Sequence, residues 1–416
     1  MLAASAAASF AHATPAQWHV ARRKAILAAH PEVQNLIGRE QWTLPALAAT
    51  NALQLSGAVA CAHLPDPALV PLAVLVGGTL SLWQFALLHD VKHGTAALPD
   101  GVDPNAVLFA GSLPSLFGYF LYLRYGHLTH HKDFGRQPLK QLFNSEVAAF
   151  EDGDALFVAH RQQMRGDAPH ARVGFVGQDD VGGLGLSISR TIYSLLWLDD
   201  ADDADAQSAA ARARAAYNAA IFGLSMSFER AALVFGGAVV PALTGRNFFF
   251  PNKPDSFHAT CANYARASTA LALVVAAVAG PGALTWLFWA EVGWQLPIHP
   301  ASAMFVSNHP SLESPVDDVG CQPTASVYLS SGDGHWYDWL CCFSNYHTEH
   351  HDFPDVPAFR LRKLRDLAPE HYADDALAGA RDGWWETMRR TFAGRDFYAC
   401  SGAMEEVERV EVEASA

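Results

Sequence analysis

Uncharged apolar runs alternate with polar stretches along the chain, and these runs predict helices that cross a lipid bilayer. Three of them come early and are 19, 21 and 18 residues long: 44–62, 68–88 and 106–123. These lengths are close to the roughly 20 residues that a helix needs to cross the hydrocarbon core. Two weaker runs follow at 231–244, with a start near Ala219 as the longer alternative, and at 267–290. A buried helix in a soluble protein can mimic any one run, but several together favour a membrane protein.

The same pattern predicts an all-α, multi-pass bundle of about four to six membrane helices. With the histidine clusters and the resemblance described below, we also expect a cytosolic helical cap that holds a histidine-rich di-metal site. We expect a cytosolic amino-terminal segment at 1–43, a membrane domain at 44–360 and a cytosolic carboxy-terminal segment at 361–416. The polar insert at about 150–217 interrupts the membrane domain, and its piece 182–197 is expected on the membrane surface. The Ala-rich start carries no basic residue before Arg22, which favours a flexible start over a cleaved targeting peptide.

Charge and cysteine content narrow the class of protein further. Only 17% of the residues are charged, and the mean hydropathy of +0.07 fits a membrane part beside a sizeable aqueous part. A net charge of −14 argues against a nucleic-acid partner, which needs cations to neutralise its phosphates. The six cysteines contain no CxxC pair, so free thiols in a reducing compartment are the simpler interpretation.

The nineteen histidines are unusual in number, and many of them gather in three clusters. The clusters read HDVKH at 89–93, HLTHH at 127–131 and HTEHH at 347–351. Positions three and four apart share one face of a helix, so each cluster aims two or three imidazoles at one point. Imidazole suits iron, zinc and copper alike, and eight such ligands exceed what one four-coordinate zinc ion uses. The clusters therefore predict two adjacent metal ions.

The positions of the clusters relative to the apolar runs support a shared site. His89 directly follows the run that ends at Leu88, and His127 lies shortly after the run that ends at Leu123. If the runs 68–88 and 106–123 cross in opposite directions, both clusters emerge on one face of the membrane. Two further crossings, near 219–244 and 267–290, would bring the third cluster to that face as well. This prediction depends on both late runs spanning the bilayer.

Each cluster also has a plainer interpretation. A lone HxxxH on a helix is more often a surface accident than a pair of ligands. HDVKH is close to the zinc-protease pattern HExxH, with Asp90 in place of Glu, but a zinc hydrolase leaves six of the eight histidines unused. A protein that only sequesters metal or binds lipid is a further alternative, from a class other than the enzymes.

The set HxxxH, HxxHH, HxxHH beside paired apolar runs resembles the integral-membrane fatty acid desaturase and hydroxylase superfamily. Four segments sharpen the resemblance to sphingolipid Δ4-desaturases. They are YHTEHHDFP at 346–354, QWHVARRKAILAAHPEVQNLIG at 17–38, LPIHPASAMFVSNHP at 296–310 and FFFPNKP at 248–254. Together they extend over nearly the whole chain.

This resemblance implies an endoplasmic-reticulum enzyme, with its histidine clusters facing the cytosol, that introduces the 4,5-trans double bond into dihydroceramide. It implies two iron ions, O2 as co-substrate, and electrons from NAD(P)H through cytochrome b5 and its reductase. No HPGG haem-binding signature occurs, so the cytochrome b5 is expected to be a separate partner. The pattern does not separate this activity from a sphingolipid C4-hydroxylase, a bifunctional enzyme or another lipid desaturase.

The resemblance also carries over a set of metal ligands. The expected ligands are His89, His93, His127, His130, His131, His347, His350 and His351. A ninth ligand is expected from 299–309, with His309 favoured over His299. Met304 and Asn308 stand where the relatives commonly have His and Glu.

Three acidic residues sit beside the expected ligands. Asp90, Glu349 and Asp352 are candidates to accept the second ring N–H of an imidazole and so orient it. For Asp90, a solvent-facing position on the helix is an equal alternative. The sequence makes no prediction of the oligomeric state.

Overall fold

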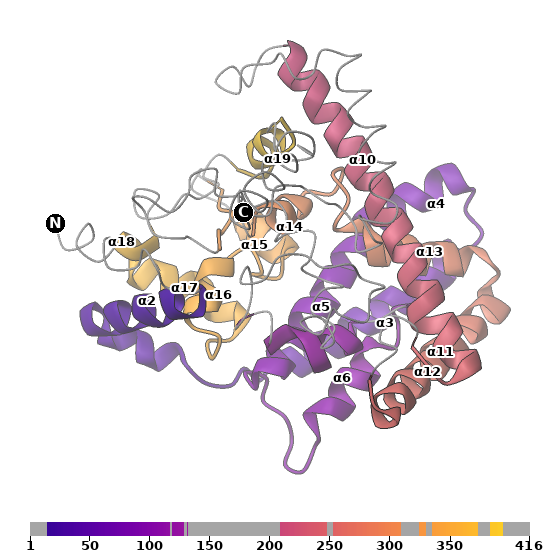
Figure 1. Cartoon of the computed structure of the whole chain (residues 1–416), viewed down its shortest axis with the longest axis horizontal. Coiled ribbons are helices and arrows are strands. Elements are labelled where there is room, and N and C mark those ends of the chain that lie inside the picture. The colour runs from indigo at the N-terminus through magenta and orange to yellow at the C-terminus, as the bar shows by residue number, and fades with distance from the viewer. Residues whose placement is uncertain are drawn as a thin grey trace, which may run out of the picture.

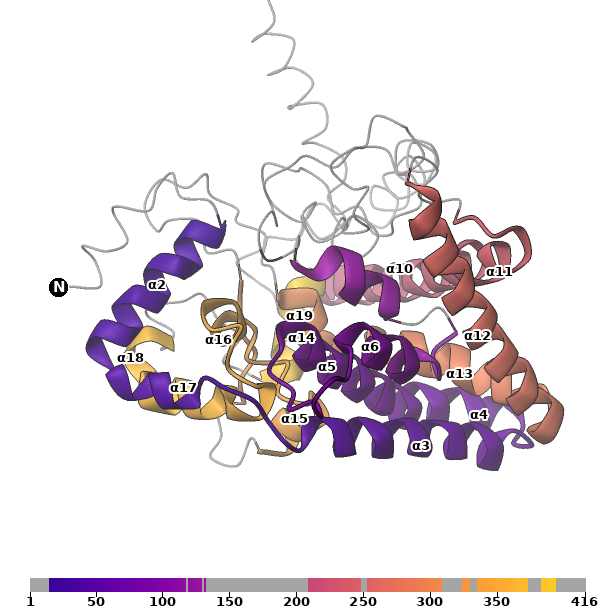
Figure 2. The same cartoon turned by 90° about the horizontal axis from the view of Figure 1, so that it is seen from below.

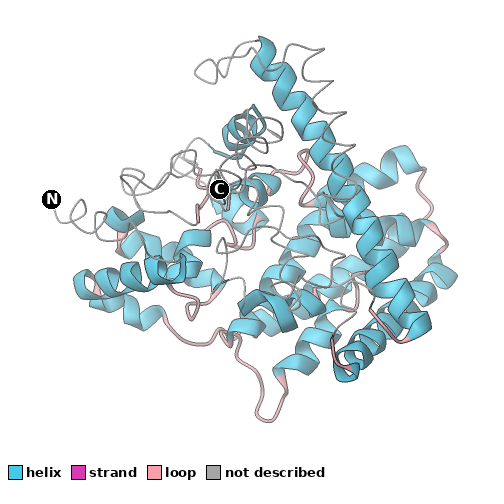
Figure 3. Cartoon of the chain, viewed as in Figure 1, coloured by secondary structure: helices cyan, strands magenta, loops and turns pink. Residues whose placement is uncertain are grey.

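Helices account for nearly all of the regular structure in the described part of the chain. The computed structural model describes residues 15–116, 119–128, 131, 209–247, 253–308, 324–329, 335–372 and 383–393. Within these ranges no strand forms, and an isolated β-bridge pairs Glu40 with Ala96 (Figure 3). The predicted all-α class is therefore confirmed for the described residues.

The helices form two groups that meet at the histidine clusters. Figure 1 shows α3, α5, α6 and α10–α13 on one side, while α2 and α16–α18 lie on the other. The first group, which we call the bundle, contains α3 (Thr43–Cys61), α4 (Asp66–Leu72), η2 (Ala73–Gly77), α5 (Gly78–His93), α6 (Pro104–Ser112), η3 (Tyr122–Gly126), α10 (Ala209–Val234), η6 (Phe235–Val239), α11 (Val240–Thr244), α12 (Asp255–Ala279) and α13 (Gly282–Gly293).

The second group, which we call the lobe, joins the amino-terminal helix to a late segment of the described chain, residues 347–372. It contains α2 (Pro15–Ala29), η1 (Pro31–Leu36), α16 (His347–Asp352), η7 (Ala358–Arg360), α17 (Leu361–Leu367) and α18 (Pro369–Tyr372). Figure 2 shows α2 and α16–α18 gathered on one side of the molecule. The core of the lobe includes Trp18, Ile26, Tyr346, Phe353 and Leu364. Between the groups lie α14 (Ser302–Ser307), α15 (His335–Leu340) and α19 (Gly383–Ala393).

Three helices in the described ranges are long and apolar enough to cross a membrane. They are Thr43–Cys61, Asp66–His93 and Asp255–Ala279. The first two confirm the apolar runs at 44–62 and 68–88, and the second is the continuous helix formed by α4, η2 and α5. The total of four to six spans stays a prediction, as does the cytosolic position of the lobe.

Two predicted spans are wrong as single helices, and in each case a helix-breaking sequence explains the result. The run 106–123 is divided because α6 ends at Ser112, just before Leu113-Pro114. The run 267–290 is divided at Gly280-Pro281, where Gly280 adopts a φ of +100° and Pro281 has no N–H to continue the ladder. The long apolar helix in this region instead begins at Asp255.

Glycine allows the bundle helices to approach one another closely. A Cβ added at Gly293 of α13 would lie 2.6 Å from the carbonyl oxygen of Val74, and one at Gly282 would lie 2.0 Å from that of Ala62. Neither contact is sterically possible, so both positions require glycine. Small residues at such crossings are typical of helix packing in membranes. This packing holds α13 against α3, η2 and α5.

A buried ion pair lies inside the bundle between α10 and α13. Arg230 donates from Nη1 to Oε1 of Glu291 at 3.3 Å and from Nη2 to Oε1 of Gln295 at 3.3 Å. The other carboxylate oxygen of Glu291 accepts the backbone N–H of Leu116 at 2.8 Å. Arg230 and Glu291 are only 5% and 1% exposed, so each charge depends on the other for compensation.

Candidate metal centre

The first histidine cluster lies on the last turn of α5. His89 and His93 are one helical turn apart, and their ring centroids are 4.6 Å apart. The helix ends directly after His93 because Gly94 takes the left-handed conformation with φ +73°, a typical C-terminal cap. Nζ of Lys92 donates to the carbonyl of Arg124 at 3.0 Å and so ties this turn to the segment before the second cluster.

The second cluster follows the π-turn η3. A π-turn places residues i and i+5 on one face, and here it brings the hydroxyl of Tyr122 to 3.1 Å from Nδ1 of His127. His127 and His131 are one turn apart, with ring centroids 4.7 Å apart. His130 lies outside the described residues. Tyr122 therefore fixes the orientation of the His127 ring from within its own helix.

The third cluster is carried by the short helix α16, which is set by a tight turn before it. Cys342 and Phe343 in that turn both have positive φ, at 47° and 60°, which L-residues rarely adopt. Nδ2 of Asn345 holds the turn by donating to the carbonyl of Val327 and to Asp338, each at 3.0 Å. The turn directs His350 toward the first two clusters.

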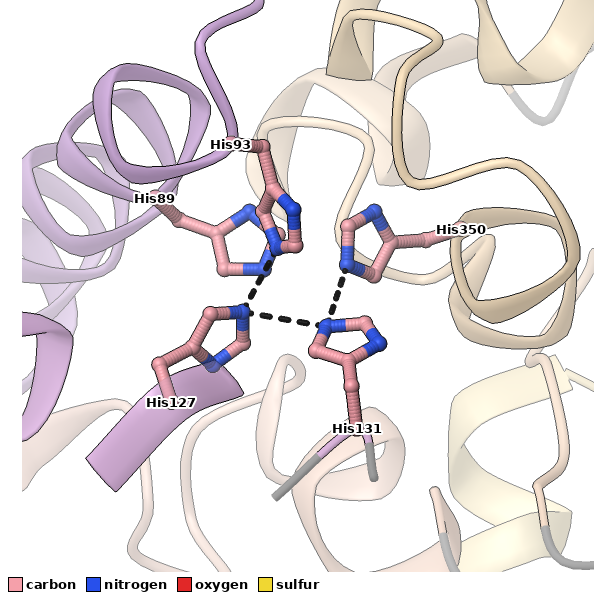
Figure 4. Close-up of side chains that lie close together, drawn as sticks. All are labelled: His89, His93, His127, His131 and His350. Carbon is pink, nitrogen blue, oxygen red and sulfur yellow. Dashed lines mark hydrogen bonds between the residues drawn. The ribbon is translucent and has the colours of Figure 1, made fainter. Parts of the chain in front are cut away.

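Five imidazoles from the three clusters converge on one point (Figure 4). Their ligand atoms all lie within 4.8 Å of one another: His89, His93, His127, His131 and His350. The Nε2–Nε2 distances are 2.7 Å from His93 to His127, 3.1 Å from His127 to His131, and 3.1 Å from His131 to His350. Segments that are distant in sequence thus meet at one place.

Hydrogen bonding alone does not explain this chain of nitrogen contacts. A neutral imidazole nitrogen either donates one proton or accepts through one lone pair. In the row of contacts His93–His127–His131–His350, the Nε2 atoms of His127 and His131 each have two partners. Hydrogen bonding would require one of these nitrogens to donate a single proton to two acceptors, and the other to accept two hydrogen bonds through a single lone pair. Five buried or half-buried rings whose nitrogens meet at one point instead fit a shared cation, which imidazole nitrogens bind well.

A second group of imidazoles adjoins the first through His131. The ring centroid of His351 is 4.1 Å from that of His131 and 4.5 Å from that of His347. Seven of the eight predicted box histidines therefore form one continuous array, which we call the histidine array. The array consists of the five-histidine group and the pair His347 and His351, which meet at His131. Two such groups fit a di-metal site.

Electrostatics keeps the array suited to metal binding. Burial, followed by the neighbouring histidines, holds the pKa of His350 well below its usual range. A neutral imidazole retains the lone pair that a metal needs, whereas a protonated one does not. The lobe and the bundle together bury His127, His350 and His351, which also limits access of bulk water.

The three acidic residues beside the clusters each hold a different part of the scaffold. Asp90 accepts the backbone N–H of Ala358 at 3.2 Å and so fastens the chain after the third cluster to α5. Glu349 accepts from Ser326 at 2.6 Å and from the hydroxyl of Tyr328. Burial raises the pKa of Glu349 to about 7. None of these contacts is to an imidazole of the array.

Asp352 does contact a histidine, but one that lies outside the three clusters. Its Oδ1 lies 2.7 Å from Nδ1 of His19, and its Oδ2 accepts from Nε of Arg22 at 3.0 Å. The ring of His19 is in turn 5.1 Å from that of His351. The amino-terminal helix α2 therefore braces the third cluster. Neither His19 nor Arg22 belongs to a histidine cluster, so no sequence pattern predicted this role for them.

The two candidates for a ninth ligand have different outcomes. His299 is buried, and its Nε2 lies 3.2 Å from the carbonyl of Leu75 and 3.1 Å from Oγ1 of Thr79. Both partners belong to the helix Asp66–His93, at least ten residues before His89, so the structure does not bring His299 into the array. His309 lies outside the described residues.

Comparisons with known proteins agree with this arrangement. Residues 194–378 match the family model described as fatty acid desaturase, and residues 8–42 match the model described as sphingolipid Delta4-desaturase (DES). The second match contains η1 and the part of α2 that bears His19 and Arg22. No solved structure gave a significant match.

Several similar proteins are named as sphingolipid delta(4)-desaturases. A sphingolipid delta(4)-desaturase DES1-like protein of Oryza sativa subsp. japonica is 22% identical over 85% of this chain and 80% of its own length. A putative sphingolipid delta(4)-desaturase/C4-monooxygenase of Caenorhabditis elegans is 41% identical over 18% of this chain. The human sphingolipid delta(4)-desaturase/C4-monooxygenase DES2 is 31% identical, also over 18% of the chain. The nematode and human alignments span only 17% and 20% of those relatives.

Apolar helices long enough to span a bilayer, together with a convergent histidine array, are the features of a membrane protein with a candidate di-metal site. Within that class, the chain is similar to fatty acid desaturases over residues 194–378 and to sphingolipid Delta4-desaturases over residues 8–42.

Proposed function

We propose that the chain is a di-iron, O2-dependent sphingolipid desaturase that introduces the 4,5-trans double bond into dihydroceramide. The observation that carries the proposal is the histidine array itself, braced by an amino-terminal segment that matches the Δ4-desaturase model. Removal of one hydrogen from each of two adjacent methylenes, with O2, two electrons and two protons, yields the double bond and two molecules of water.

The residues of the chain have distinct tasks in this proposal. The ligands would be His89, His93, His127, His130, His131, His347, His350 and His351, with His309 as the candidate for a ninth. Bound iron would supply the redox chemistry that side chains alone cannot perform on an unactivated C–H bond. Tyr122 would orient the His127 ring, and Asp352 would hold the third cluster in place through α2.

The cellular setting follows from the subgroup. Electrons would come from NAD(P)H through a separate cytochrome b5 and its reductase, and the enzyme would act in the endoplasmic-reticulum membrane with its histidine array facing the cytosol. Purified protein combined with cytochrome b5, reductase and NADH should convert dihydroceramide only when O2 is present. Bound iron without any change in the lipid would instead support a protein that only sequesters metal or binds lipid.

A sphingolipid C4-hydroxylase is the second candidate, because the names of the nematode and human relatives include a C4-monooxygenase. Hydroxylation uses the same O2 and electrons but inserts one oxygen atom into a C–H bond and releases one water. Both outcomes begin at the same part of the lipid, so the shape of the histidine array does not distinguish them.

Expression in a desaturase-deficient cell, followed by mass spectrometry of its ceramides, tests the proposal. We expect ceramide to appear with the wild-type chain and with the control variant His63→Ala, which changes an exposed histidine outside the array. His127→Ala should abolish the product. Phytoceramide as the main product would replace the desaturase assignment with the hydroxylase. Production of neither lipid by a folded, iron-loaded protein would overturn both.

A further inference from the structure

A second group of possible metal ligands lies on the outer side of the lobe. His30 stands between α2 and η1, while Glu370 and His371 belong to α18. One ligand atom from each residue lies within 4.8 Å of the other two. The two histidines are half-buried and Glu370 is exposed, so an ion in solution can reach all three. None of these residues belongs to the histidine array.

The separations between these atoms are close to those around a small metal ion. Nε2 of His30 lies 2.5 Å from Oε1 of Glu370, and Nε2 of His371 lies 3.9 Å from the same oxygen. Tetrahedral bonds of about 2.0–2.1 Å to zinc separate neighbouring donors by roughly 3.4 Å. That distance falls between the two observed values, so movements of less than about 1 Å would complete the geometry.

Neighbouring charges and burial set the protonation of the two imidazoles. Oε1 of Glu32 lies 3.4 Å from Nδ1 of His30, on the opposite side of the ring from Glu370. The hydrogen bond to Glu370 and the pair with Glu32 raise the pKa of His30, so a metal ion would bind Nε2 in place of the proton between His30 and Glu370. Burial lowers the pKa of His371, which keeps that ring neutral near pH 7.

We propose that His30, Glu370 and His371 form a site for a divalent transition-metal ion, with Zn²⁺ the ion that suits two imidazoles and one carboxylate. Three protein ligands leave a fourth position for water. The ion would join α2 to α18, two elements separated by most of the chain. Nη2 of Arg22 already donates to the carbonyl of His371 at 3.0 Å, so the ion would reinforce the connection that reaches Asp352.

Zinc titration of the purified full-length chain against a competing chelator tests this proposal. The wild-type chain should bind one Zn²⁺ more than the variants His371→Ala and Glu370→Gln. The affinity of the site in these variants should fall by more than the roughly 10- to 100-fold that loss of an outer-shell partner causes. The control His63→Ala, on an exposed histidine after α3, should keep the wild-type number of ions.

A second measurement distinguishes loss of the site from loss of the fold. Glu370→Gln changes one exposed side chain, so its metal content at the histidine array should equal that of the wild type. Zinc should also slow trypsin cleavage after Arg22 and Arg23 in the wild type and not in Glu370→Gln. Equal zinc binding by the wild type, His371→Ala and Glu370→Gln would overturn the proposal.

Discussion

Oδ1 of Asp352 lies 2.7 Å from Nδ1 of His19, although 333 positions separate these residues in the sequence. Arg22 contacts the same carboxylate, so two residues of α2 bind the last residue of α16. The amino-terminal segment is therefore part of the support of the histidine array. The segment that matches the sphingolipid Delta4-desaturase model, residues 8–42, contains no box histidine but supplies this support through α2.

Asp352→Asn should loosen the amino-terminal helix and lower the metal content. The change leaves the largely buried Arg22 without its charged partner, and breaking a buried pair costs about 3–5 kcal/mol. Limited proteolysis after Arg22 and metal analysis of the purified protein measure the two effects. The matched control is Asp355→Asn, whose pair with Arg23 is 29% and 40% exposed and contributes about 0–1 kcal/mol. Equal behaviour of the two variants would contradict this role for Asp352.

Tyr122→Phe should weaken metal binding while preserving the fold. The substitution removes only the hydroxyl that lies 3.1 Å from Nδ1 of His127, and loss of an outer-shell partner typically costs 10- to 100-fold in metal affinity. Metal retention during dialysis against a chelator gives the readout. Tyr264→Phe removes a similar hydrogen bond, to the carbonyl of Ser112, that involves no histidine of the array. It should cost about 1 kcal/mol of stability and leave metal retention unchanged.

Arg230→Met should destabilise the bundle by about 3–5 kcal/mol, because it leaves the Glu291 carboxylate buried without its guanidinium. The double variant Arg230→Met/Glu291→Gln should recover most of this loss. A glutamine at 291 is neutral and still offers an oxygen to the backbone N–H of Leu116. Thermal unfolding in detergent compares the two variants. A double variant no more stable than the single one would show that the ion pair is not the source of the loss.

Cys341 and Cys342 should resist alkylation in the native protein at pH 8. Burial raises the pKa of both thiols above the usual value of 9, so the reactive thiolate is scarce until the pH is well above that of the experiment. Mass spectrometry after treatment with iodoacetamide should find both thiols unmodified in the native state and modified after denaturation. Rapid labelling of either cysteine in the folded protein would contradict the burial described.

The sequence predicted those features that depend on local periodicity. Apolar runs gave the helices at Thr43–Cys61 and Asp66–His93, and helical spacing correctly placed His89 and His93 on one face. Periodicity failed where a break lies within an apolar run, as at Leu113-Pro114 and Gly280-Pro281. Hydropathy averages over a window and does not register one residue that cannot continue a helix.

Other features of the site depend on contacts that no local pattern encodes. The link from His19 to Asp352 exists only after α2 packs against α16, so proximity in the fold was needed to see it. Asp90 shows the same principle, because its partner is the backbone of Ala358 and not an imidazole. Tyr122 escaped notice because it lies five residues before His127, a spacing that an α-helix would not use.

The π-turn at Tyr122–Gly126 makes the chain intolerant of a change in length at this point. Each residue advances an ordinary helix by about 100°, so a single-residue deletion between Tyr122 and His127 would rotate everything after it by that angle. His127 and His131 would then leave the array together, even though every histidine would still be present in the sequence. The rotation about the helix axis that this turn sets therefore matters as much as the identity of the ligands that follow it.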